Sequence, residues 1–272
     1  KPVNIKSDID ALGEFPELRE INRDIRRLNL ASYSPLKYVL PHKRDEYGRK
    51  YDKVVKGGSV FRQIHREENL IHLMRVNLLK RMESSIHSFA RTVERLLADV
   101  RGIIEKLEGH SALEVEDLSI EDIELDDEDF AEQVVGSNVK VLLQDVDKLR
   151  WMQELREDEE ILTRLLRYAR AIGPERDLKL RRLKDEIRKK CENPINPGNN
   201  KVLVFTAFAD TARYLYDNIA EWARTELGLH TALVTGGNGG NQTTMPGIRK
   251  DIGSILTSFS PVSMERDKVD KD

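Results

Sequence analysis

The stretch MESSIHSFARTVERLLADVRGIIEKL, residues 82–107, carries the most regular apolar pattern in the sequence. Its apolar residues are separated alternately by four and three positions: Met82, Ile86, Phe89, Val93, Leu96, Val100, Ile103 and Leu107. A heptad pattern of this length is typical of a long helix that packs along another helix. With the apolar residues just upstream, it predicts one helix over residues 60–108, about 70 Å long, that ends at Gly109.

A second helical stripe over residues 139–172 predicts a returning arm that ends at Gly173-Pro174. Two such arms bury their stripes against each other as an antiparallel hairpin. Between them, residues 111–132 contain eleven acidic residues and no basic one. Such a run is typical of a solvated linker at the tip of a hairpin, and binding of a partner by this acidic segment is left open.

The region before the long helix, residues 1–58, is mixed in character. The apolar spacing of residues 18–28 predicts a short amphipathic helix. Pro35 and Pro41 leave only a short extended segment between them, and Gly57-Gly58 then break the chain. We interpret this region as the end of a larger unit.

The region after Gly173 alternates helix and strand patterns. Residues 176–190 predict a basic amphipathic helix, and the short apolar run at 201–206 predicts a strand buried on both faces. A helix is expected at 211–227, a second strand at 231–235, a flexible loop at 236–247 and a third strand at 254–258. This alternation predicts an α/β fold with a parallel sheet and crossover helices.

Composition narrows the class of protein. The formal net charge is −3, charged residues make up 34% and aromatic residues 6%, a balance typical of long solvated helices. A single cysteine, Cys191, excludes a disulfide framework and a cysteine-based zinc finger. No apolar run reaches the roughly 18 residues of a membrane span. We therefore expect a soluble, cytoplasmic protein without a membrane partner.

Two segments near the ends of the expected strands are candidate ligand sites, because α/β sheets bind ligands at the carboxyl ends of their strands. Thr206 and Phe208 follow the first strand, and Thr235, Gly236 and Gly237 end the second. Glycines there expose backbone N–H groups to an anion such as phosphate. The alternative is a plain helix cap, made by Asp210 or Thr211, and a mobile loop, since the sequence contains no Gly-x-x-x-x-Gly-Lys-Ser/Thr motif.

Other reactive residues favour structural roles. His65, Glu68 and His72 share one helix face, a spacing that suits a metal ion, but a polar face against a neighbouring module explains them better. Cys191 has no histidine at ligand spacing and ends a basic helix, so we do not expect a reactive thiol. The serine pair at residues 84–85 lacks a hydrolase elbow. We expect no metal site and no acyl-transfer chemistry.

Basic residues form two clusters, one with Arg75, Lys80 and Arg81 and the other in residues 176–190. Each phosphate that such a cluster neutralises adds a salt-dependent contribution to nucleic-acid affinity. Solvated helix faces with partners at i,i+4 are an equal alternative.

Three blocks of sequence resemble a known family. Residues 201–219 (KVLVFTAFADTARYLYDNI) and 233–237 (LVTGG) resemble the opening of the second RecA-like lobe of superfamily-two helicases. Residues 73–89 (LMRVNLLKRMESSIHSF) resemble the block that joins the two lobes in the bacterial chromatin-remodeller-like branch. The pattern Asp177-x-Lys179-x-x-x-Leu183 fits the same branch.

The resemblance implies an ATP-driven motor on double-stranded DNA, with ATP and Mg²⁺ held between two lobes. It divides the sequence into the end of the first lobe (1–58), a helical protrusion (59–173) and the N-terminal half of the second lobe (174–272). It implies DNA contacts by Thr206, Phe208, Thr235, Gly236 and Gly237, with Lys80 and Arg81 touching DNA phosphate or coupling the lobes.

The sequence departs from this family where ATP is hydrolysed. The lysine phosphate loop, the Asp-Glu metal box and the arginine finger are absent from the 272 residues. Phosphoryl transfer requires these parts together, so we expect a central fragment of a helicase that is inactive on its own.

The competing hypothesis is a non-enzymatic module whose helical hairpin binds a protein partner. The motor hypothesis requires that residues 201–258 form side-by-side parallel strands layered with helices.

Overall fold

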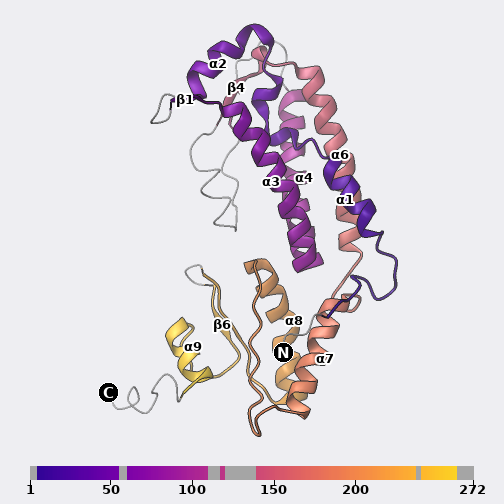
Figure 1. The fold of residues 1–272 in the computed structure, drawn as a ribbon, viewed down its shortest axis with the longest axis vertical. Helices are drawn as coiled ribbons and strands as arrows, with labels where there is room; N and C mark the ends of the chain where they lie inside the picture. Colours follow the sequence, from indigo (N-terminus) through magenta and orange to yellow (C-terminus); the bar gives the residue numbers. More distant parts are fainter. Residues whose placement is uncertain (1–4, 55–59, 110–116, 120–138, 237–239, 262–272) are drawn as a thin grey trace. The chain divides into compact units, whose positions relative to one another are not determined.

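A computed structural model describes residues 5–54, 60–109, 117–119, 139–236 and 240–261 (Figure 1). Contacts divide the chain into two compact units. Residues 16–83 and 89–171 form the first, called here the helical unit, and residues 1–15, 84–88 and 172–272 form the second, the α7–α8 unit. One division falls at residue 172, next to the boundary expected at 173–174. The assignment of residues 1–58 to a first lobe stays a prediction.

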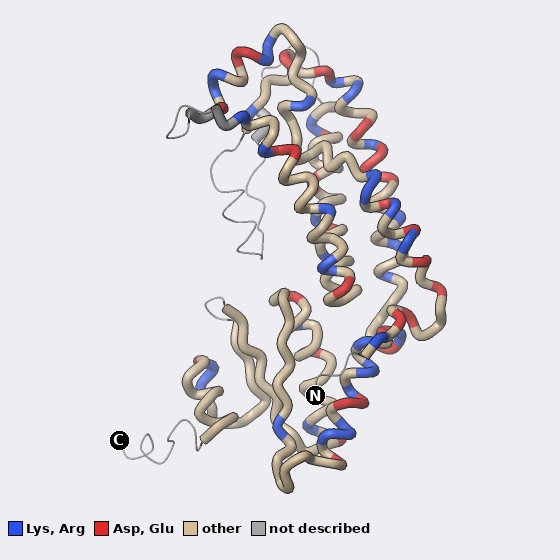
Figure 2. The backbone as a smooth tube through the Cα atoms, viewed as in Figure 1, with Lys and Arg blue, Asp and Glu red and all other residues tan. Residues whose placement is uncertain are grey.

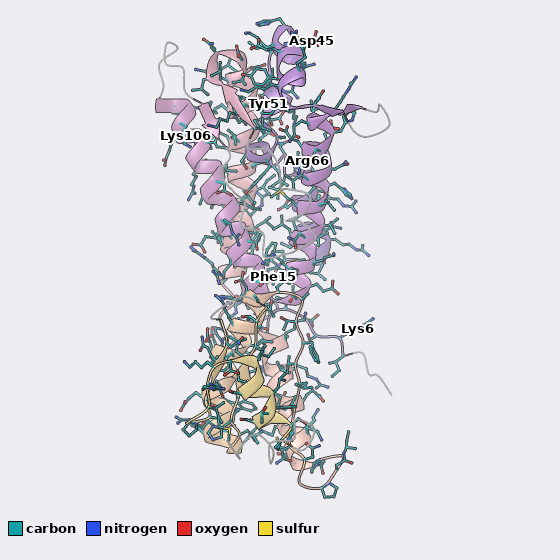
Figure 3. The ribbon with its side chains drawn as sticks, turned by 90° about the vertical axis from the view of Figure 1, so that its left-hand side faces the viewer. Lys6, Phe15, Asp45, Tyr51, Arg66 and Lys106 are labelled. Carbon is teal, nitrogen blue, oxygen red and sulfur yellow. The ribbon has the colours of Figure 1, made fainter. Side chains whose placement is uncertain are left out.

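The helical unit consists mainly of long helices, and side chains lie between them (Figure 3). Its elements are α1 (Leu18–Arg27), η1 (Ala31–Tyr33), η2 (Pro35–Tyr38), η3 (Pro41–Lys43), α2 (Arg44–Tyr51), β1 (Lys53–Val54), β2 (Val60–Phe61), α3 (Gln63–Ser84), α4 (Ile86–Gly109), β3 (Asp117–Ser119), β4 (Lys140–Leu142), η4 (Leu143–Asp145) and α6 (Lys148–Arg170). The last residue of α3 and the first residues of α4, within 84–88, are assigned to the α7–α8 unit. β1 pairs antiparallel with β2, and β3 with β4.

The long helix expected over residues 60–108 is two helices, α3 and α4, interrupted at Ser85. The prediction of one continuous helix is wrong because Ser85 turns its side chain to the backbone, where its Oγ accepts a hydrogen bond from His87 N at 3.2 Å. The heptad stripe is buried along α4 as expected, except that Ile104 is buried where the pattern placed Ile103.

Helices α4 and α6 are antiparallel, as expected for the two arms. Three ion pairs link them: Glu94 with Arg170, Arg101 with Glu159 at 2.8 Å, and Glu108 with Arg156. As the residue number increases along α4, the number of its partner on α6 decreases, which shows that the two helices run in opposite directions. The buried apolar residues of both helices lie between these surface pairs.

Two local predictions in this unit are wrong. Residues 140–145 form β4 and η4 rather than the start of a helix, because Asp147 caps α6 through a hydrogen bond from Arg150 N at 3.0 Å. The proline-flanked residues 35–43 form two 3₁₀ turns with only a short extended link. Pro35 and Pro41 each begin a turn, where a missing N–H costs nothing.

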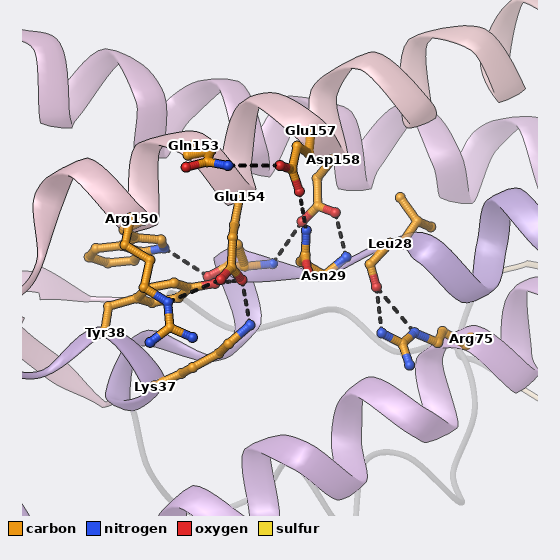
Figure 4. Close-up of polar contacts among 12 residues, drawn as sticks. Leu28, Asn29, Lys37, Tyr38, Arg75, Arg150, Gln153, Glu154, Glu157 and Asp158 are labelled. Atoms are coloured by element: carbon orange, nitrogen blue, oxygen red, sulfur yellow. Dashed lines mark hydrogen bonds and ion pairs between the residues drawn. The ribbon is translucent and has the colours of Figure 1, made fainter.

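The chain between α1 and η1 is clamped by buried polar groups (Figure 4). Asp158 on α6, fully buried, accepts hydrogen bonds from Asn29 N at 2.6 Å and Ala31 N at 2.8 Å. Trp151 Nε1 donates to Ala31 O at 2.9 Å. Arg75 on α3 donates through Nε and Nη2 to Leu28 O. Four backbone groups are thereby satisfied by side chains from two helices.

A second part of this network surrounds Glu154 on α6 (Figure 4). Its carboxylate receives hydrogen bonds from Tyr38 Oη at 2.7 Å, from Arg150 Nε at 3.2 Å and from Lys37. Tyr38 also stacks on Trp151 with ring centroids 5.3 Å apart. In the same unit, Tyr51 Oη donates to Lys140 O and accepts from Lys140 N (Figure 3).

The α7–α8 unit packs helices on one small core. Its remaining elements are α7 (Leu178–Glu192), α8 (Ala209–Leu227), β5 (Ala232–Leu233), β6 (Gln242–Thr243) and α9 (Ile252–Phe259). Asp177 caps α7 by accepting from Leu180 N at 3.0 Å, and Gly228 ends α8 in the left-handed conformation. The core joins the two helices through Leu180, Ile187, Tyr214, Ile219 and Ala223.

The parallel sheet expected at residues 201–258 is not formed by the described residues. Residues 201–206 form no strand, and Leu203 and Phe205 are 64% and 88% exposed. β5 pairs antiparallel with β6, with Ala232 opposite Thr243 and Leu233 opposite Gln242. Residues 254–258 lie in α9, whose start is fixed by Asp251 accepting from Ser254 N at 2.8 Å. Helix and strand are mixed, with helix dominant.

We expect Asp158→Asn to lower the free energy of unfolding by about 2 kcal/mol, because the new amide presents a donor to one of two backbone N–H groups. Chemical denaturation measures this change. Glu157→Gln, at the adjacent and exposed position, is the control and should shift stability by under about 0.5 kcal/mol. Equal losses in the two variants would contradict the role given to Asp158.

Glu67 makes stability depend on pH. The side chain is 4% exposed, Oε2 accepts from Leu36 N at 3.2 Å, and Oε1 has no partner among the described residues. Burial raises its pKa to about 9. Because the folded pKa lies above the unfolded one, the protonated acid stabilises the fold, and this stabilisation is lost as pH rises toward 9.

We expect the free energy of unfolding to fall on the order of 3 kcal/mol more in the wild type than in Glu67→Gln between about pH 5.5 and about pH 8. Denaturation curves of both proteins at the two pH values provide the measurement. Parallel pH profiles would show that Glu67 is ionised in the folded protein.

Candidate functional site

The structure places the predicted site residues in both units. Lys80 and Arg81 lie near the end of α3 in the helical unit, where Lys80 is exposed and Arg81 is 2% exposed. Only Lys80 therefore presents its charge to solvent. Thr206, Phe208, Thr235 and Gly236 belong to the α7–α8 unit, and Gly237 lies outside the described residues.

Thr206 and Phe208 shape the start of α8. Phe208 is the N-cap residue and is 4% exposed, and Thr206 Oγ1 donates a hydrogen bond to its carbonyl at 2.8 Å. The helix has no side-chain cap, so the expectation that Asp210 or Thr211 caps it is wrong. Both side chains are buried instead, and the Thr211 hydroxyl forms hydrogen bonds with serine side chains rather than with the helix backbone.

Three hydroxyl groups join the α3–α4 break to the start of α8. Thr211 donates to Ser88 Oγ at 3.1 Å, and Ser84 Oγ lies 3.0 Å from Thr211 Oγ1. Because a hydroxyl carries one proton, Thr211 accepts from Ser84 while it donates to Ser88. We call Ser84, Ser88 and Thr211 the hydroxyl cluster.

Aromatic and charged groups surround the hydroxyl cluster. His87 stacks on Tyr214 with ring centroids 4.7 Å apart and planes inclined by 11°. Tyr214 Oη donates to Asp177 Oδ2 at 2.9 Å, and Lys179 Nζ donates to Ser84 O at 3.4 Å. Burial, and then the Asp177 carboxylate, raise the pKa of Tyr214, so its hydroxyl stays a donor. The arrangement fixes α7, α8 and residues 84–88 to one another.

Sequence reasoning missed this cluster, although a signal was present. Ser84 and Ser88 lie one helical turn apart inside an apolar pattern. Thr211 lies four residues before Leu215, and so on the same face of the expected helix as this apolar residue. Small hydroxyl side chains at core positions indicate a polar contact with another element. The sequence alone does not name that element.

Asp10 and Arg176 link the chain near residue 10 to the residues just before α7. Arg176 Nη2 lies 2.7 Å from Asp10 Oδ2, and the guanidinium, as the main cause, lowers the pKa of that carboxyl well below its usual range. Asp10 also forms an antiparallel bridge with Asp177. The pair therefore fixes the residue that receives the Tyr214 hydroxyl.

The remaining candidates occupy structural positions. His65, Glu68 and His72 are exposed on α3, and the described residues contain no group of three side chains able to hold a metal ion. Cys191 packs against the α7–α8 core. Basic residues are spaced along α7 (Figure 2), several of them paired, as Arg182 with Glu186 and Arg188 with Glu226.

No helix in the described part of the chain is both long and apolar enough to span a bilayer. Comparison of the sequence with protein-family models and with curated proteins finds no match, and comparison of the fold with solved structures finds none. The site must therefore be interpreted from its own geometry.

Thr211→Val should lower the free energy of unfolding by about 1–2 kcal/mol, because the isosteric side chain breaks both hydrogen bonds of the buried hydroxyl. Thermal or chemical denaturation measures it. Thr225→Val is the matched control on the exposed face of α8, where we expect a change of under about 0.5 kcal/mol. A neutral Thr211→Val would show that the hydroxyl cluster does not stabilise the unit.

Proposed function

We propose that this chain is part of an ATP-dependent DNA translocase of the superfamily-two helicase class. Within that motor it supplies part of the second lobe and a helical arm, and it contacts the backbone of double-stranded DNA. The proposal also includes the RecA-like parallel sheet, to which residues 201–206 and 231–235 would contribute inner strands.

The observation that carries the proposal is the meeting of the three family-like blocks. Residues 73–89, 177–183 and 201–219 are far apart in the sequence, yet Ser84, Ser88 and His87 contact Thr211 and Tyr214, and Asp177 receives the Tyr214 hydroxyl. Blocks that resemble one family in separate stretches are expected to be spatial neighbours if they form one functional element. Their convergence supports a common origin of the three resemblances.

The exposed apolar segment is a second support. Leu203, Val204 and Phe205 are 64%, 47% and 88% exposed, and Val234 is 39% exposed. Soluble proteins rarely leave adjacent apolar residues open unless another surface covers them. In the proposed lobe, neighbouring strands cover them. The described residues do not meet the requirement of parallel strands over residues 201–258, because β5 pairs antiparallel with β6, so the proposed sheet rests on this exposure and on the resemblance.

ATP and Mg²⁺ belong to the proposed motor, but the residues of this chain do not fit them. The lysine phosphate loop and the Asp-Glu box are missing from the sequence. We therefore derive no catalytic step here and propose that this chain alone does not hydrolyse ATP. Its proposed part in the motor is contact with DNA and transmission of movement.

Of the proposed DNA contacts, Lys80 is the best placed in the helical unit because its side chain is exposed. Arg81 is buried, which suits a role in holding α3 in place. Thr206, with Thr235 and Gly236, remains a proposed contact in the α7–α8 unit, and the buried Phe208 shapes the turn before α8.

We expect the chain to bind a fluorescently labelled duplex with a salt-dependent affinity, and Lys80→Ala to weaken binding about three- to tenfold while reducing the salt slope by about one. Fluorescence anisotropy at several salt concentrations measures both. Lys106→Ala, an exposed cation on α4, is the control and should bind as the wild type does. Absence of duplex binding by the wild type would overturn the DNA-contact proposal.

A non-enzymatic module that binds a protein partner is the second candidate. It is favoured by the dominance of paired helices in the helical unit, where α4 and α6 have 24 and 23 residues and the described strands have only two or three. The same duplex titration separates the two candidates. Failure to bind duplex even at low salt would leave the interaction module as the better proposal.

A further inference from the structure

A threonine, a glycine and an arginine converge in the α7–α8 unit. A Cβ atom placed on Gly240 would lie 2.2 Å from Thr235 Oγ1 and 3.5 Å from Arg213 Nη2. The Thr235 hydroxyl and the Arg213 guanidinium therefore lie close to the same point beside Gly240. Only glycine fits there, because any side chain would overlap the hydroxyl.

Two of these groups lack the partner that their chemistry requires. Thr235 Oγ1 is buried and has no hydrogen-bond partner among the described residues. Arg213 is exposed on α8, and no carboxylate in the described part of the chain pairs with it, although Asp217 lies one turn further along the helix. Buried polar atoms are nearly always satisfied, so an unsatisfied hydroxyl beside an unpaired guanidinium indicates a missing acceptor.

The missing acceptor is best supplied by an oxyanion. A guanidinium presents parallel N–H donors that match phosphate oxygens, and a hydroxyl donates a further hydrogen bond. Asn241 Oδ1 accepts from Thr235 N at 3.1 Å and so holds the residue in place. Because Gly240 has no side chain, the Thr235 hydroxyl and the Arg213 guanidinium can both lie close to its main chain.

We propose that Arg213, Thr235 and the main chain at Gly240 form a phosphate-binding site, with Arg213 as its principal charged contact. Arg213 and Gly240 were not among the residues predicted from the sequence. In the proposed motor, on which this assignment of ligand rests, the phosphate is a phosphodiester of duplex DNA. The terminal phosphate of a free nucleotide has the same chemistry and is the alternative source.

The test measures duplex binding by fluorescence anisotropy for the wild type, Arg213→Ala and Arg224→Ala. Arg224 is exposed on the same helix and is paired with Glu221 at 2.9 Å, so it controls for loss of a surface charge. We expect Arg213→Ala to lose about tenfold in affinity, to the same degree on two unrelated duplex sequences, with a salt slope smaller by about one. Arg224→Ala should bind as the wild type does.

Two further variants leave the net charge unchanged, so a loss of affinity in them cannot come from a lost surface charge. Arg213→Lys retains the charge but loses the paired donors, and should recover only part of the affinity. Gly240→Ala should weaken binding because its methyl group displaces the Thr235 hydroxyl. Circular dichroism and denaturation confirm that each variant folds.

A second arm identifies the source of the phosphate. Isothermal titration with inorganic phosphate and with ADP is carried out on the wild type and on Arg213→Ala. Binding of ADP that Arg213→Ala abolishes, with duplex affinity unchanged, would support the site and assign it to a nucleotide. Wild-type affinity of Arg213→Ala for duplex, phosphate and ADP would overturn the site, while duplex binding by the wild type would leave the proposed function standing.

Discussion

The interruption at Ser85 is the constraint on which the rest of the structure depends. A straight helix over residues 63–109 would keep residues 84–88 on its own surface. At the break, Ser84 and Ser88 both face Thr211, and His87 stacks on Tyr214. Five residues of a helical pair thereby belong to the α7–α8 unit, while the helices on both sides belong to the helical unit.

The helical unit pairs its heptad stripe with an unusually polar interior. Asp158, Glu67 and Arg81 are almost fully buried. Asp158 accepts hydrogen bonds from the backbone N–H groups of Asn29 and Ala31, just after α1. Leu30 adopts a left-handed backbone conformation there, which a leucine reaches only at an energetic cost. Such groups specify one path for the chain, because any other path would leave a buried charge or a backbone N–H without a partner.

The sequence was informative where a pattern depends on neighbours within one helix. The apolar faces of α1, α4, α6, α7 and α8 were predicted, as was the antiparallel pairing of α4 with α6. Apolar residues at helical spacing identify the face of a helix that is buried. It was misleading at residues 201–206 and 254–258, because strand pairing depends on partners that no local pattern names. Asp251 and Ser254 indicate the helix at 252–259 in hindsight. The role of Thr235, Gly236 and Gly237 as a ligand site stays a prediction, and the contacts of Arg213, Thr211 and His87 were not predicted.

The open segment at residues 201–206 has a practical consequence for handling the protein. KVLVFT joins high β-propensity to low charge, and its backbone groups form no ladder with the described residues. A segment of this kind is a template for cross-β stacking between copies. Lys201 is the only charged residue in the segment, so we expect this segment to cause precipitation when the protein is concentrated. Replacing Phe205 by a polar residue should reduce that precipitation.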